Sequence, residues 1–128
     1  MTEPLHVVLD DTAMVAVGQG NVLASRLIHR AHAEAGWHLY APVCALVEAD
    51  RARPGTAEHL SALPSVTIVE LDLAGALGVA ADEARGWALP HAQHIARPTA
   101  ERPDGAVIAT TRPARWTGHT VRVLDLTG

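Results

Sequence analysis

The strongest constraint on the fold of this chain is a repeated order of short apolar runs and helical segments. Helical segments separate the first four apolar runs, whereas a short turn separates the last two. Because successive strands joined by helices must run in the same direction, this order predicts a parallel sheet with helices on both faces. We expect a single three-layer α/β domain over residues 1–128, with a central sheet of about five strands. The expected strands are Leu5–Leu9, Trp37–Tyr40, Val66–Val69, Ala106–Ala109 and Val121–Leu124.

Turn and capping residues set the expected helix boundaries. Asn21 is a suitable N-cap, because its side-chain oxygen can accept a hydrogen bond from the first helical turn. Gly36 is expected to end the same helix as its C′ residue, and Pro98 to end the last helix. The expected helices cover 13–17, 21–36, 42–53, 56–63, 72–85 and 90–98.

The composition predicts an aliphatic core in a reducing compartment. Hydrophobic residues make up 48% of the chain, but Phe is absent, so the core must consist mainly of Leu, Val, Ile and Ala. Cys44 is the only cysteine and lies in an apolar stretch, which favours a small buried hydrophobe over a nucleophile. The first nine residues lack the pattern of a signal peptide, and no apolar run is long enough to cross a membrane. We therefore expect a cytoplasmic protein without disulfides.

Charge is unevenly distributed along the chain. The formal net charge is −4, and all ten basic residues are arginine, which excludes a generally basic nucleic-acid binder. Residues 1–84 contain four arginines and eleven acids, whereas residues 85–128 contain six arginines and three acids. An acidic pocket beside a basic flank would suit a metal-dependent enzyme that acts on a phosphate backbone. A compositional bias toward Ala and Arg explains the same numbers equally well.

Acidic residues follow the first expected strand. Asp10, Asp11 and Thr12 stand at its carboxyl end, and Glu48 lies about two turns into the helix after the second strand. In parallel sheets the functional crevice lies at the carboxyl ends of the strands. We therefore expect Asp10 and Glu48 to converge at one edge and to share Mg²⁺ or Mn²⁺, which prefer carboxylate oxygens.

Three short motifs in this order resemble the PIN-domain family, which includes the VapC-type toxin nucleases. The segment from Leu9 to Ala16 is similar to the family motif LDTSALLA. Pro42 and Glu48 have the family's spacing of a proline followed six residues later by a glutamate. The segment 110–113, Thr-Thr-Arg-Pro, is similar to a strand that ends in Thr-x-Asp-Pro.

The resemblance implies a divalent-metal-dependent endoribonuclease. Asp10 and Glu48 would then hold Mg²⁺ or Mn²⁺, and Thr12 would orient Asp10. The ion would activate the water that attacks the phosphodiester. The family also implies a small antitoxin-like protein partner and a homodimer.

Two acids of the family pattern are replaced in this chain. Arg112 stands at the fourth acidic position, and the segment 90–96, where the third is expected, contains His91 and His94 but no acid. A cation about 4 Å from a metal site opposes the binding of Mg²⁺. The site is therefore a degenerate version of the family's site.

Three interpretations of the altered site remain open. In the first, His91 and His94, which share one helix face, join Asp10 and Glu48 in a mixed site for Mn²⁺, Fe²⁺ or Zn²⁺. In the second, Arg112 pairs with Asp10 or Glu48 and replaces the metal. The chain would then be a catalytically silent PIN-like module that binds a protein partner or RNA.

The third interpretation is a weak nuclease that supplements Asp10 and Glu48 with another acid. The candidates for this supplementary acid are Asp11, Asp50 and Asp104.

Other readings of the motifs fit less well. A receiver domain also has an acidic pair after its first strand, and phosphatases with an aspartyl nucleophile begin with Asp-x-Asp. Both need a lysine, which this chain lacks. The glycine-rich turn 18–21 lacks the spacing of a phosphate-binding loop. A last possibility is a strip that contacts RNA through arginines and a stacking tryptophan, formed by Arg97, Arg102, Arg112, Arg115 and Trp116.

Overall fold

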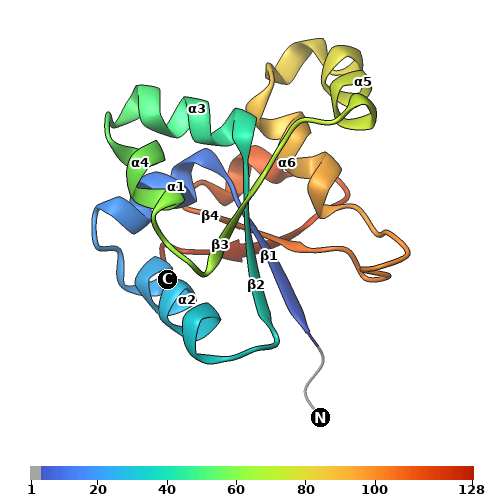
Figure 1. The fold of residues 1–128 in the computed structure, drawn as a ribbon. Helices are drawn as coiled ribbons and strands as arrows, with labels where there is room; N and C mark the ends of the chain where they lie inside the picture. The colour runs from blue at the N-terminus through green and yellow to red at the C-terminus, as the bar shows by residue number, and fades with distance from the viewer. Residues whose placement is uncertain (1–3) are drawn as a thin grey trace.

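The computed structural model describes residues 4–128 and has an α/β fold around a five-stranded parallel sheet (Figure 1). The strand order is β3-β2-β1-β4-β5, and every neighbouring pair is parallel. The predicted fold class and all five predicted strands are thus confirmed. The strands are β1 (Leu5–Leu9), β2 (Trp37–Pro42), β3 (Val66–Val69), β4 (Val107–Thr110) and β5 (Arg122–Asp125).

Six α-helices and two short 3₁₀ turns connect the described strands. Asn21 caps α2 as predicted, because its side-chain oxygen accepts a hydrogen bond from the Ala24 amide at 2.9 Å. The helices are α1 (Asp11–Gly18), α2 (Val22–Ala33), α3 (Val43–Ala52), α4 (Thr56–Ser61), α5 (Leu73–Ala81) and α6 (Ala88–Ala96), and the turns are η1 (Glu83–Arg85) and η2 (Pro113–Trp116).

Two predicted helix ends were wrong. Helix α2 ends at Ala33 and not at Gly36, whose carbonyl accepts a hydrogen bond from the Leu5 amide at the start of β1. Helix α5 ends at Ala81 and does not continue to Arg85. The Asp82 carboxylate pairs with the Arg85 side chain, and Gly86 takes a positive φ of 68°, so the chain turns there before α6.

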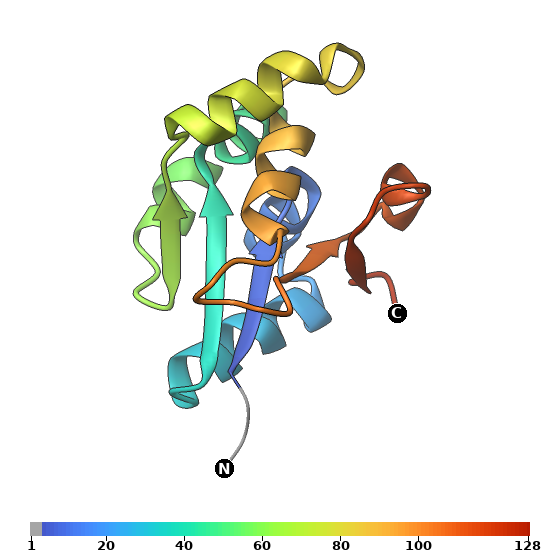
Figure 2. The same ribbon diagram turned by 90° about the vertical axis from the view of Figure 1, so that its right-hand side faces the viewer.

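Side chains of successive strand residues point to opposite faces of the sheet and form two separate cores. On one face, Val7 and Leu9 pack with residues of α1, α2, α3 and α4. On the other, Val8 and Ile108 pack with α6 and Trp116. Figure 2 shows α6 and α2 on opposite sides of the strands. The three-layer arrangement brings the carboxyl end of β1, α3 and the turn η2 toward the same edge of the sheet.

No helix in the described part of the chain is long and apolar enough to span a membrane. The sequence-based expectation about a signal peptide concerned the first nine residues. Residues 1–3 of that segment lie outside the described range, and Leu5–Leu9 forms β1.

Asn21 links α2 to the end of the sheet, which allows a specific stability test. Its oxygen caps α2, and its Nδ2 donates a hydrogen bond to the Leu126 carbonyl at 3.1 Å. We expect Asn21→Ala to lower the free energy of unfolding in urea by about 1–2 kcal/mol. The matched variant Asn21→Asp retains the cap but loses the donor, so it should lose about half as much. Equal losses in both variants would show that the cap contributes little.

Candidate functional site

Asp10 lies between β1 and α1 and is almost completely buried, with 1% of its surface exposed. One carboxylate oxygen, Oδ1, accepts hydrogen bonds from the Ala13 amide at 2.9 Å and from the Thr12 hydroxyl at 2.7 Å. The Ala13 bond makes Asp10 the N-cap of α1. The other oxygen, Oδ2, accepts from the Trp116 indole at 3.2 Å and from the Arg115 guanidinium at 3.5 Å. A carboxylate has about four lone-pair positions, and four donors from the protein surround this one.

Arg115 is the cation of this site. Its Nη1 atom lies 2.5 Å from an oxygen of Asp11 and 3.5 Å from an oxygen of Asp10. The side chains of Arg115 and Asp11 are each only 20% exposed, so water screens their attraction less than at an open surface. One guanidinium therefore bridges the two acids that follow β1.

Thr12 extends the network to β4. Because its hydroxyl donates to Asp10, it acts as an acceptor toward the Thr111 amide at 3.0 Å. The hydroxyl groups of Thr12 and Thr110 lie 3.1 Å apart. These contacts fix the position of the Asp10 carboxylate against the end of β4.

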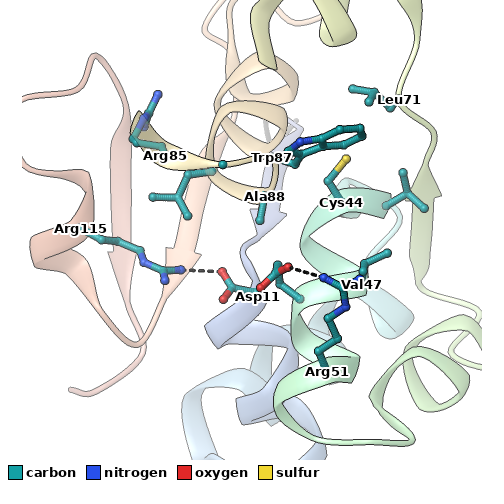
Figure 3. A pocket seen from close by; sticks show the side chains of 13 residues that line it. Asp11, Cys44, Val47, Arg51, Leu71, Arg85, Trp87, Ala88 and Arg115 are labelled. Carbon is teal, nitrogen blue, oxygen red and sulfur yellow. Dashed lines mark hydrogen bonds and ion pairs between the residues drawn. The ribbon is translucent and has the colours of Figure 1, made fainter. Parts of the chain in front are cut away.

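A pocket of about 750 Å³ opens beside the Asp11–Arg115 pair (Figure 3). Val43, Cys44 and Val47 of α3 line it together with the segment around Trp87, whose ring lies near Cys44. Two ion pairs border it, because Glu48 also lines the pocket and lies 3.5 Å from Arg51. The pocket is thus mainly apolar with charged groups at its margin, as is common in binding sites.

The structure brings Glu48 into the same pocket as Asp11, but Asp10 does not line it. The Glu48 side chain is 51% exposed, whereas Asp10 is enclosed by its hydrogen-bond donors. The sequence indicates Asp11 only as a supplementary acid, and no motif indicates that Arg115 pairs with it. A signal for one of these hydrogen bonds was present in the sequence, since an Asp directly before a helix is a typical N-cap.

The residues of this site do not fit a divalent metal ion. The Ala13 amide, the Thr12 hydroxyl, the Trp116 indole and a guanidinium all donate hydrogen bonds to the Asp10 carboxylate. That guanidinium, of Arg115, stands where an ion shared by Asp10 and Asp11 would be. Within residues 4–128, no three His, Cys, Asp or Glu side chains are grouped so that they could hold an ion.

His91 and His94 do not join Asp10 and Glu48. His91 is buried, and its Nδ1 accepts a hydrogen bond from the Cys44 amide in the first turn of α3 at 3.4 Å. His94 lies beside Asp72, with its Nε2 3.6 Å from the carboxylate. The geometry gives no support to the mixed-ligand interpretation: His91 holds the start of α3, where Pro42 provides no side-chain cap.

Burial lowers the pKa of His91 below its ordinary value of 6.5. The neighbouring His94 lowers this pKa further, whereas a hydrogen bond with the Glu70 backbone and the charge of Asp72 oppose the shift. His91 is therefore neutral in the folded protein near pH 7, as its role as an acceptor requires.

Arg112, which the second interpretation paired with the acids, is exposed and is not the arginine that contacts them. Its backbone amide donates to the Thr110 hydroxyl, while Arg115, three residues later, reaches Asp10 and Asp11. The prediction that Arg112 pairs with Asp10 or Glu48 is therefore wrong, and Arg115 makes the contacts to Asp10 and Asp11 instead. One turn of η2 separates the two residues and carries Arg115 back over the end of β1.

Several members of the expected RNA strip make contacts within the fold. Trp116 is only 2% exposed, and its indole is bonded to Asp10, so it cannot stack on a base. Arg102 donates to the Ile95 carbonyl and lies over the ring of Tyr40. Arg97 is exposed at the end of α6.

Three further residues were considered from the sequence: Asp50, Asp104 and Cys44. The Asp50 carboxylate accepts hydrogen bonds from the amides of Gly55 and Ala57 and so holds the start of α4. Asp104 is exposed in the loop before β4. Cys44 is buried as expected, and burial raises the pKa of its thiol.

Comparison with known proteins gives no assignment. No family model matches the chain, and no curated protein matches it. Proposals about function therefore depend on the motifs and on the geometry of the site.

The neutral state of His91 predicts a specific pH dependence of stability. Below about pH 6.5 the unfolded chain takes up a proton that the buried imidazole of the folded protein resists. The free energy of unfolding should therefore fall as pH is lowered, by up to about 1.4 kcal/mol per pH unit for this group.

The variant to compare with the wild type is His91→Gln, whose side chain can form hydrogen bonds but does not titrate. Its stability, measured in urea between about pH 7.5 and pH 5, should fall less steeply than that of the wild type. His32→Gln, at an exposed position of α2, controls for the loss of an imidazole. Parallel curves for wild type and His91→Gln would contradict the assignment.

Proposed function

We propose that this chain is a PIN-like module that no longer cleaves RNA and instead binds a protein partner. The main support for this proposal is the position of the Arg115 guanidinium, which bridges Asp10 and Asp11 at distances of 3.5 and 2.5 Å. In a PIN-like nuclease the acids at the end of β1 would hold the catalytic ion. Here an internal cation neutralises them, so hydrolysis through a bound ion has no free ligands at this position.

The contacts of the basic residues favour a protein partner over RNA. The guanidinium groups of Arg102 and Arg115 make contacts within the fold, and Trp116 is buried. The pocket beside Asp11 is lined mainly by apolar side chains, which suit a protein segment better than a phosphate backbone. The small antitoxin-like protein implied by the motifs is one such partner, and a homodimer remains a prediction.

A second candidate is the metal-dependent endoribonuclease that the motifs resemble. One observation favours it, because Asp11 and Glu48 line the same pocket. Each of these acids, however, is already paired with an arginine, so this candidate requires both ion pairs to break before an ion can bind.

An RNA-cleavage assay tests the proposed function. Wild type and Asp10→Asn should be equally inactive on single-stranded and on structured RNA with Mg²⁺ or Mn²⁺, because neither protein offers a metal site. Circular dichroism of both proteins confirms that the variant is folded. Cleavage by the wild type that exceeds cleavage by Asp10→Asn would refute a silent module and restore the nuclease.

A further inference from the structure

Helix α5 has an unusual surface for an exposed helix. Its nine residues, Leu73 to Ala81, include no charged or polar side chain. Gly75 and Val79 are buried where the helix packs on α6. The opposite side carries Leu73 and Leu77, which are 76% and 64% exposed.

The exposed leucines lie on one face of α5, because they are four residues apart. Ala74, Ala80 and Ala81 are also exposed, and the open space around Gly78 leaves room for an approaching side chain. Figures 1 and 2 both show the helix at the periphery of the molecule. An apolar helix face of this kind, free of charge, usually marks an interaction surface.

Acidic residues border α5 at both ends. Glu70 and Asp72 precede it, and Asp82 and Glu83 follow it, with no basic residue anywhere in the segment 70–84. Asp82 pairs with Arg85. Glu70 and Glu83 are exposed, and neither carboxylate has a salt-bridge partner among the described residues. Two arginines lie beside this surface, because Arg85 and Arg97 line a hollow together with Gly78 and Ala81.

The geometry points to α5 and its bordering acids as the docking surface for a basic amphipathic helix of a partner protein. The partner would place an apolar stripe on Leu73 and Leu77, and arginines or lysines opposite Glu70 and Glu83. Helix α5 is itself about 14 Å long, and Glu70 and Glu83 lie beyond its two ends, so the basic groups of the partner should be separated by more than that distance. A second copy of this chain fits less well, because it would place its own acids against these acids.

This inference deepens the proposed function, because it names the surface and the chemistry of the protein partner. It involves none of the residues around Asp10, and its test is independent of cleavage. If the wild type cleaves RNA, the proposed function fails whatever binds to α5. If no cleavage is seen and no basic helix binds, only the docking surface fails.

The probes are two synthetic helical peptides of about 16 residues, long enough to form a helix. Both carry the same leucine stripe; one has arginines at both ends and the other has glutamates. Fluorescence anisotropy with the full chain should show saturable binding of the basic peptide, at least about tenfold tighter than that of the acidic peptide. This preference should weaken as salt is added.

Matched variants locate the binding surface. Leu73→Gln/Leu77→Gln should weaken the basic peptide about tenfold, whereas Val22→Gln, an equally exposed position on α2, should have no effect. Glu70→Gln/Glu83→Gln should reduce the preference for the basic peptide, and Glu58→Gln, an exposed acid of α4, should not.

Three results would overturn the proposal. Equal binding of the two peptides would show only apolar adhesion. Equal weakening by the Val22 and leucine variants would place binding elsewhere. A wild-type dimer in analytical ultracentrifugation that Leu73→Gln/Leu77→Gln converts to a monomer would show that a second copy covers this face.

Discussion

The arrangement of this site depends on the hydrogen bonds that the buried Asp10 carboxylate accepts. Asp10 is fully enclosed, and its two oxygens accept from a backbone amide, a hydroxyl, an indole and a guanidinium. A buried carboxylate without partners would be strongly unfavourable. Its donors come from α1 and from η2, so a single group joins β1 to the connection between β4 and β5.

The same interaction is the basis of our proposal that the site lacks the chemistry that its motifs imply. In a metal site, an ion would neutralise the acids at the end of β1. Here Arg115 provides that positive charge from within the chain, and the pairing needs no divalent ion. Removing one partner of a buried pair leaves the other charge uncompensated. Loss of Arg115 alone would therefore destabilise the fold, and its guanidinium stands where an ion shared by the two carboxylates would lie.

Much of the fold was predictable because it depends on local patterns. The aliphatic runs at Leu5–Leu9 and Val66–Val69 form strands as expected, and Asn21 caps α2. One error concerns a tertiary contact, and the other concerns a local ion pair. Gly36 does not end α2, since its carbonyl bonds to the start of β1. Asp82 stops α5 through its pair with Arg85, and the sequence alone does not show this contact.

The site was harder to predict, because the choice between neighbouring residues depends on side-chain direction. Asp10 and Asp11 are adjacent, yet one is buried and the other lines the pocket. Arg112 and Arg115 differ by one turn of η2, and only Arg115 reaches the acids. His91 is placed by the helix packing of α6 against α3, which turns it away from the acids and toward the Cys44 amide.

A crystal structure determined from crystals soaked in Mn²⁺ tests the central claim most directly, because the anomalous signal of manganese locates a bound ion. The account predicts that the Arg115 guanidinium lies within hydrogen-bonding distance of Asp11 and next to Asp10, with no anomalous peak between the two carboxylates. A manganese peak between them, with the Arg115 side chain turned toward solvent, would contradict it.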